Sequence, residues 1–123
     1  MQNSIIYNKA FHFAVRIIEL CRMINHINKN ETSITQQLLK SGTAIGALVA
    51  EAGNAQSKAD FINKMNVALK EANETNYWLN LFQATGMLPP SVEVSSYLNE
   101  NIEIIKILVS IVKTSKGNLG NQK

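Results

Sequence analysis

A strict three-and-four spacing of apolar and small residues runs through the middle of the chain and restricts it to helical folds. Steps of four and three alternate without a break at Phe61, Met65, Ala68, Ala72, Thr75, Leu79 and Phe82. In an α-helix such positions form one continuous stripe, whereas a strand requires alternation at every second residue. The segment therefore predicts a long amphipathic helix that packs in the manner of a coiled coil.

Three further segments carry helical patterns of their own. A first helix is expected from about Ser4 to Asn28, a second from Ser33 and a fourth from a cap at Ser91. The expected core positions of the second helix are Ile34, Leu38, Ile45, Val49 and Ala52. Each of these helices has one apolar face to bury.

Capping residues mark where these helices begin and end. Ser33 with Gln36, and Ser57 with Asp60, match the capping box that opens a helix. Gly86 can end the third helix, and the two prolines that follow forbid its continuation.

Four helices with short connections pack most readily as an antiparallel up-down-up-down four-helix bundle. The 123 residues suffice for one core, and two prolines and six glycines are too few for the many tight turns of a β-sandwich. We therefore predict an all-α fold with one domain over residues 1–114 and a disordered tail over residues 115–123.

Several locations and chemistries are disfavoured. No apolar run reaches the roughly 20 residues of a membrane span, and the N-terminal residues lack the pattern of a signal peptide, so a cytoplasmic protein without membrane contact is expected. The single Cys21 can form neither an internal disulfide nor a cysteine-based zinc site, and its apolar neighbours predict a buried thiol.

No set of side chains predicts catalysis, a cofactor or a metal. His12 and His26 lie 14 residues apart on one expected helix, about 21 Å, and cannot share an ion. Glu71 and Glu74 share a helix face without a histidine partner, so we expect solvated helix charges and not an acid–base pair. The chain is therefore not expected to be an enzyme.

Two features indicate contact with a further helix. One side of the second helix carries almost no side-chain bulk, because its residues there are Gly42, Gly46 and Ala50. Each of the two glycines costs about 1 kcal/mol in helix propensity, so their presence inside a helix needs a reason. The expected core face of the fourth helix holds Val94, Tyr97, Leu98, Ile105, Leu108 and Val112. Four more apolar residues extend its apolar arc beyond what one core needs: Ile102, Ile104, Val109 and Ile111. Gly42, Gly46, Ala50, Ile102 and Val109 are the candidates for an interface between subunits.

The net charge of +3 is concentrated in the first helix. Residues 1–30 hold Lys9, Arg16, Arg22 and Lys29 against Glu19, while the rest of the chain sums to zero. A basic helix face can bind the phosphates of RNA or DNA, and it can equally be an ordinary solvated surface. Both interpretations stay open from the sequence alone.

The second and third helices resemble a known family. Gln37-Leu-Leu-Lys-Ser-Gly-Thr-Ala-Ile-Gly46 and Ala68-Leu-Lys-Glu-Ala-Asn-Glu-Thr-Asn-Tyr-Trp-Leu79 are similar to segments of the proteins called 23S ribosomal RNA intervening sequence proteins. The similarity extends from the first helix to the fourth and is densest from Glu31 to Phe82.

This resemblance implies a four-helix bundle that assembles into a cyclic pentamer, without known catalysis or cofactor. Related accessory proteins of diversity-generating retroelements are basic pentamers that bind nucleic acid and a reverse transcriptase. Where many relatives have arginine, this chain has Lys40 and Asn76. Lysine supplies only a point charge to a phosphate and asparagine none, so of these two only Lys40 is a candidate nucleic-acid contact. We therefore expect a homo-oligomeric scaffold that presents a surface to a protein partner, with nucleic-acid binding as the alternative.

Overall fold

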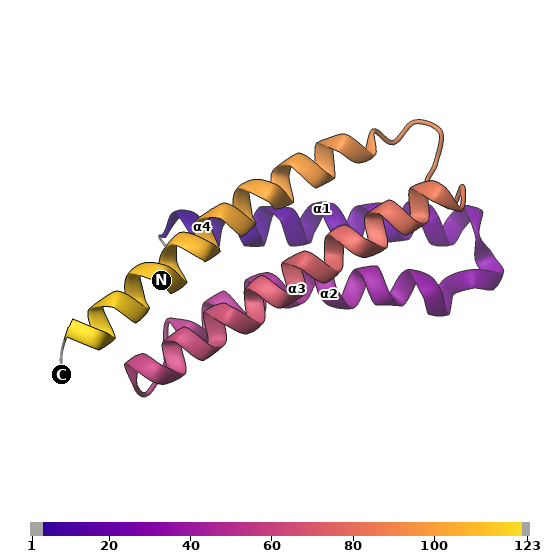
Figure 1. The fold of residues 1–123 in the computed structure, drawn as a ribbon. Coiled ribbons are helices and arrows are strands. Elements are labelled where there is room, and N and C mark those ends of the chain that lie inside the picture. Colours follow the sequence, from indigo (N-terminus) through magenta and orange to yellow (C-terminus); the bar gives the residue numbers. More distant parts are fainter. Residues whose placement is uncertain (1–3, 122–123) are drawn as a thin grey trace.

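The computed structural model describes the backbone of residues 4–121 and the side chains of residues 4–117. Within that range it contains a short 3-10 turn, Lys29–Glu31, and four long helices: α1 (Ile5–Ile27), α2 (Thr32–Ala52), α3 (Lys58–Ala84) and α4 (Val94–Asn121). Successive helices run in opposite directions (Figure 1). The predicted all-α antiparallel four-helix bundle is confirmed.

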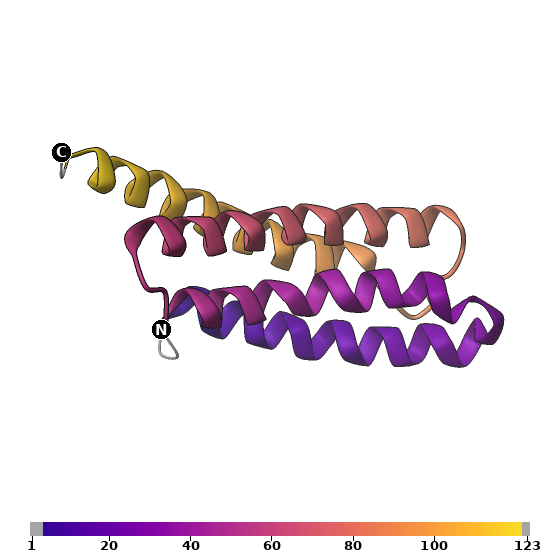
Figure 2. The same cartoon turned by 90° about the horizontal axis from the view of Figure 1, so that it is seen from below.

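The helices are not packed equally. Contact is extensive between α1 and α2, α2 and α3, and α3 and α4, whereas α1 and α4 meet at far fewer points. Two perpendicular views show that the C-terminal turns of α4 project beyond the ends of the other helices (Figure 1, Figure 2). The seam between α1 and α4 is therefore the loosest in the bundle.

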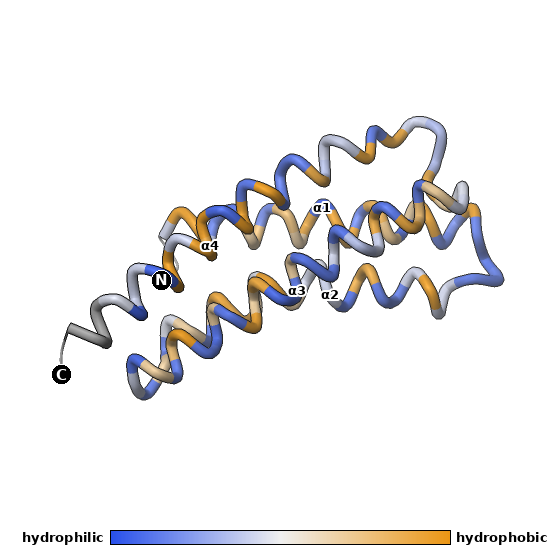
Figure 3. Tube along the Cα trace, viewed as in Figure 1, coloured by the Kyte–Doolittle hydropathy of each residue, from blue (hydrophilic) through white to orange (hydrophobic). Residues whose placement is uncertain are grey.

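Each helix alternates polar and apolar residues (Figure 3), and one side of each is buried. The heptad stripe of α3 is buried from Met65 to Phe82, as predicted, with Ile62 in place of the half-buried Phe61 at its start. On α2 the predicted core position Ile34 is wrong, because the buried row of the helix begins at Thr35 and leaves Ile34 beside it at 42% exposure. Its other predicted core positions are buried.

Two predicted helix starts are confirmed and two are wrong. Ser4 Oγ accepts a hydrogen bond from the Tyr7 amide at 3.1 Å, and Ser57 Oγ accepts one from the Asp60 amide at 3.0 Å. The 3-10 turn leads directly into α2 at residue 32, which leaves Ser33 inside the helix. α4 begins only at residue 94, so Ser91 lies in the preceding loop.

The two serines of the predicted capping boxes give a matched test. We expect Ser57→Ala to lower the unfolding free energy by about 1 kcal/mol, since alanine cannot accept the Asp60 amide hydrogen. Ser33→Ala should change it by less than about 0.5 kcal/mol, because Ser33 is exposed inside α2. Urea denaturation measures both, and equal losses would contradict the assignment of the caps.

The predicted end of α3 is confirmed. Gly86 has a φ of 74°, in the left-handed region that glycine adopts without strain. The Met87 amide donates to the Phe82 carbonyl at 3.0 Å and the Gly86 amide to the Gln83 carbonyl at 3.2 Å, the pair of bonds of a Schellman motif. The motif turns the chain toward Pro89, and the loop then leads to α4.

The small residues of α2 serve contact within the chain. A Cβ atom on Gly42 would lie 2.8 Å from Cγ2 of Ile17 on α1, and one on Gly46 would lie 3.5 Å from the carbonyl carbon of Ala10. The predicted close approach of another helix is therefore present, but that helix is α1. Because Gly42 is buried in this seam, its predicted place between subunits is wrong, while Gly46 and Ala50 are half-buried.

Polar contacts cross the core near the middle of the bundle. Thr75 Oγ1 of α3 donates to Ser41 Oγ of α2 at 3.0 Å. The fully buried Asn101 of α4 donates through Nδ2 to the Ala72 carbonyl and to Asn76 Oδ1, each at 2.8 Å. Because a buried polar group is costly without a partner, these bonds favour one alignment of α2, α3 and α4 along the bundle.

α4 is longer than the sequence predicts. The disordered tail expected over residues 115–123 is helical as far as Asn121, and residues 122–123 lie outside the described part of the chain. Val112 is the last buried side chain of α4 within residues 4–117. The final turns have no apolar stripe of their own, which is why periodicity gave no signal for them.

Candidate interaction surfaces

Two cations of the predicted basic stripe form ion pairs with carboxylates of α4. Lys9 Nζ pairs with Glu103 Oε2 of α4 at 3.0 Å. Arg16 pairs with Glu100 of α4 through Nη1, and its guanidinium carbon lies 4.1 Å from the centre of the Tyr97 ring. Both side chains therefore fasten α1 to α4, and carboxylates compensate their charges.

The other predicted nucleic-acid contacts face solvent. Arg22, Lys29 and Lys40 are exposed and enter no ion pair among residues 4–117. The sequence could not show that carboxylates of α4 would lie opposite one half of the stripe. The continuous basic face of α1 is thus reduced to two cations near its C-terminal end, with Lys40 on α2.

α4 carries apolar side chains that the rest of the chain leaves uncovered. Ile102 and Val109 are 41% and 45% exposed, and Leu98 and Ile105 beside them are half-buried. These four residues follow the same four-and-three spacing and are called the α4 strip. The exposure of Ile102 and Val109 agrees with the prediction that α4 has more apolar surface than one core covers. Ile104, predicted outside the core, is fully buried, while Leu98 and Ile105, predicted in the core, are only half-buried.

A second apolar surface lies on α1 and was missed by the sequence interpretation. Phe11 is 58% exposed and Val15 42%, Ile18 continues the row, and the Tyr7 ring stacks on Phe11 with centroids 6.0 Å apart. These four residues are called the α1 strip. The three-and-four spacing of these apolar residues along the expected first helix could have revealed this surface.

The two strips face in different directions. On α1, the ion-paired Lys9 and Arg16 mark the flank that faces α4, and the α1 strip lies on the flank toward α2. On α4, Glu100 and Glu103 mark the flank that faces α1, and the α4 strip lies on the flank toward α3. One chain thus presents two separate apolar surfaces on opposite sides of the α1–α4 seam.

Cys21 is buried, as predicted, and is chemically inert in this environment. Its Sγ lies 4.0 Å from the Thr35 carbonyl oxygen, and burial raises the pKa of the thiol to about 12. No three histidine, cysteine, aspartate or glutamate side chains gather closely enough to hold a metal ion in the part of the chain that the structure describes.

The Cys21 thiol should therefore report on unfolding. We expect the native protein to react with an aromatic disulfide reagent at pH 8 at least about 100-fold more slowly than the protein in urea, because the thiolate is the reacting form. Since the pKa is higher in the folded state, this group's contribution to stability is complete below pH 9 and falls as pH rises toward 12. Absorbance follows the reaction, and immediate labelling of folded protein would contradict burial.

No helix within residues 4–121 combines the length and hydropathy needed to cross a membrane.

Comparison with known proteins relates this architecture to a family. The family model for the 23S rRNA-intervening sequence protein matches residues 2–110. A crystal structure from Bacteroides thetaiotaomicron VPI-5482, of a protein with unknown function from the S23 ribosomal protein family, is 46% identical and has a TM-score of 0.81. The match covers 89% of this chain and 99% of that one. Among curated proteins, none matches the chain.

Proposed function

The chain belongs to the 23S rRNA-intervening sequence protein family, and from this membership we propose that it is a non-enzymatic, homo-oligomeric scaffold or accessory protein of the cytoplasm. Its role would be to assemble with copies of itself and to present a shared surface to a partner.

The observation that carries the proposal is the pair of uncovered apolar strips. Contiguous apolar surface on a helix is typical of an interface. Because the α1 strip and the α4 strip lie on different sides of the bundle, a contact of one with the other in the next copy is heterologous. Contacts of this kind generate a ring when the rotation closes, and the family resemblance sets the expected ring size at five.

Native mass spectrometry tests the assembly. We expect a dominant species of five chains at micromolar concentration, with smaller species appearing on dilution. A sharp monomer at the same concentration, with circular dichroism showing intact helices, would overturn the proposal. A closed ring with a different number of subunits would support the heterologous contact and would correct the ring size of five that the resemblance implies.

Nucleic-acid binding is the second candidate function. Arg22, Lys29 and Lys40 are exposed without ion-pair partners among the described residues, and a ring would repeat them in every copy. Phosphate contacts made by such cations are salt-dependent and have little sequence preference. Titration of labelled RNA at low and at high salt distinguishes the cases: a steep loss of affinity with salt supports binding, and no signal at low salt removes it.

A further inference from the structure

The α1 strip is part of a wider surface that spans two helices. Gly46 of α2 lies against Ala10 of α1, so the residues three, four and seven positions from Gly46 also border α1. These residues are half-buried and small or apolar: Leu39, Thr43 and Ala50. Together with Gly46 and the α1 strip they are called the α1–α2 face. None of its residues is charged.

The α4 strip is likewise part of a surface that spans α3 and α4. Asn76 of α3 accepts a hydrogen bond from Asn101 of α4, so the residues three, four and seven positions from Asn76 border α4. These residues are also uncharged: Leu69, Asn73 and Asn80. Together with Asn76 and the α4 strip they are called the α3–α4 face. Figure 2 shows α1 and α2 on one side of the bundle and α3 and α4 on the other.

The two strips lie at the same level along the bundle. The two ion pairs between α1 and α4 mark matching levels of these antiparallel helices. Phe11 lies between the paired cations along α1, and Ile102 lies between the paired carboxylates along α4. Phe11 and Ile102 are therefore level to within about one helical turn, or about 5 Å.

A common level is what a closed ring demands of two contact surfaces. Copies in a ring are related by rotation alone, whereas an added shift along the axis produces an open helical filament. If the ring axis follows the bundle, each residue keeps its level from copy to copy. α1 of one copy then runs antiparallel to α4 of the next, as it does within the chain.

We propose that the α1–α2 face of one copy covers the α3–α4 face of the next, with Phe11 opposite Ile102 of that copy. This inference rests on the proposed homo-oligomeric function and specifies the contact through which copies assemble. The α4 strip consists of large apolar side chains, whereas Gly46 and Ala50 leave the middle of the α1–α2 face shallow. A ridge on one copy thus meets a groove on the other.

The α1–α2 face has the size and the charge that a second copy requires. α2 has 21 residues and is therefore about 32 Å long, and two packed helices are about 20 Å wide, which gives a face of about 600 Å². Each partner in a stable complex buries about 800 Å², so nearly the whole face is needed. Because neither face carries a cation, a nucleic acid would find no phosphate contact on them.

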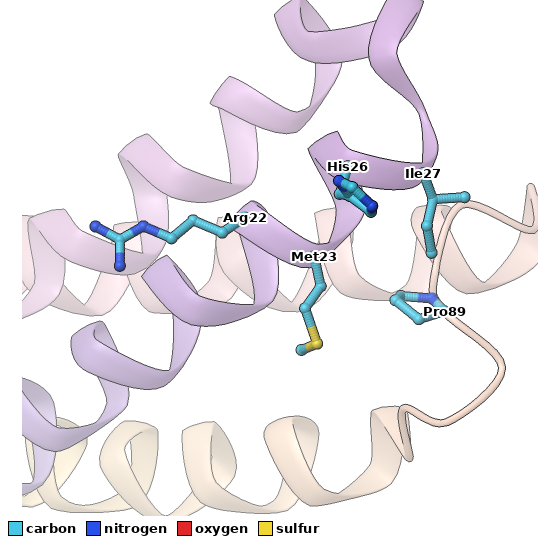
Figure 4. Close-up of a pocket in the computed structure, with 5 residues that line it drawn as sticks. All are labelled: Arg22, Met23, His26, Ile27 and Pro89. Carbon is cyan, nitrogen blue, oxygen red and sulfur yellow. The ribbon is translucent and has the colours of Figure 1, made fainter.

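The apolar hollow at the C-terminal end of α1 lies outside both faces. It has a volume of about 430 Å³ and is lined by Arg22, Met23, His26, Ile27 and Pro89. Figure 4 shows Met23 directed toward the start of α4 and Ile27 toward Pro89, while Arg22 extends away from both. The hollow opens at the seam between α1 and α4, so the proposed contact leaves it uncovered. Met23 therefore provides a control position.

Disulfide cross-linking between copies tests the arrangement. Phe11→Cys and Ile102→Cys are combined in one chain, the assembled protein is treated with a mild oxidant, and the products are separated on a denaturing gel. Cys21 is buried and does not compete. We expect a ladder of covalent multimers that ends at the ring size. A mixture of the two single variants should instead give dimers that contain one cysteine of each kind.

Two control pairs separate this contact from other arrangements. Ile18→Cys with Val109→Cys places both thiols on the strips but about 20 Å apart in level. A disulfide spans Cα atoms less than about 7 Å apart, so this pair should cross-link at least about tenfold less, although it would react well if the helices ran parallel. Met23→Cys with Ile102→Cys has an equally exposed thiol outside the face and should also react weakly.

Three results would overturn the proposal. Phe11→Cys alone forms covalent dimers, which would show that the α1 strip meets the α1 strip of another copy. Alternatively, the pair at Ile18 and Val109 reacts as well as the pair at Phe11 and Ile102. In the third, neither that pair nor Tyr7→Cys with Val109→Cys, at the other end of the same contact, cross-links. Native mass spectrometry of each reduced variant reports assembly: an assembled protein without these cross-links refutes the contact alone, and a monomeric natural chain refutes the proposed function.

Discussion

Replacement of Gly42 by leucine is expected to lower the unfolding free energy by about 3 kcal/mol, at the upper end of the usual cost of overpacking a core. Even the first added carbon would lie 2.8 Å from Cγ2 and 3.3 Å from Cβ of Ile17. Because Cβ of Ile17 is fixed to the backbone of α1, the helices must separate or shift. Urea denaturation at one fixed protein concentration measures the loss, since assembly adds to apparent stability.

Gly46→Ala is the matched control on the same helix. A Cβ atom there would lie 3.5 Å from backbone atoms of Ala10, an ordinary contact distance. Alanine should therefore stabilise the protein by up to about 1 kcal/mol, the gain in helix propensity over glycine. A Gly42→Leu variant as stable as the natural chain would show that α1 and α2 are not held this closely.

Ile102→Asp combined with Val109→Asp is expected to convert the assembled protein into monomers. Both side chains lie on the α4 strip, and an interface there would bury two carboxylates without partners. An unpaired buried charge costs about 3–5 kcal/mol, so two should weaken association by more than about 1,000-fold. Size-exclusion chromatography with light scattering measures the mass, and circular dichroism checks the fold.

The control for this variant places the same charges elsewhere on α4. Asn99→Asp with Ser110→Asp adds two carboxylates at exposed polar positions, and the natural assembly should persist. Phe11→Asp on the α1 strip should dissociate the assembly as the α4 variant does, because both sides of a heterologous contact are needed. An assembly that survives both strip variants would place the subunit contact on another surface.

Much of the fold could be predicted because periodicity reports directly which face of a helix is buried. The stripe from Met65 to Phe82, the cap at Ser57 and the stop at Gly86 all come from local rules that the bundle does not override. Ser33 and Ile34 fail for different reasons. The 3-10 turn leads into α2 at residue 32, so the helix does not begin at the capping box. The buried row of α2 runs through Thr35 and Leu38, which leaves Ile34 at its exposed edge.

The candidate surfaces were harder to predict. A sequence pattern indicates that one face of a helix is in contact with something, but it does not show whether another helix of the same chain or a second subunit makes that contact. The bare side of α2 at Gly42 correctly indicated a close neighbour, yet α1 and a second subunit would leave the same sequence signature. The basic residues of α1 were likewise visible, but their pairing with Glu100 and Glu103 depends on how α4 lies against α1. Which charges pair across helices can therefore be read only from the tertiary structure.

The buried amide of Asn101 has a consequence for how copies of this chain would fit together. If α4 slid along α3 by one turn, the carboxamide would lose the Ala72 carbonyl and Asn76 Oδ1 as partners. The amide therefore favours one position of α4 along α3. The Lys9–Glu103 and Arg16–Glu100 ion pairs tie α4 to α1, so these contacts together fix the α4 strip relative to the α1 strip along the bundle. Every protomer then offers its two contact surfaces with the same offset, so all joints between copies would be equivalent, as a symmetric ring requires.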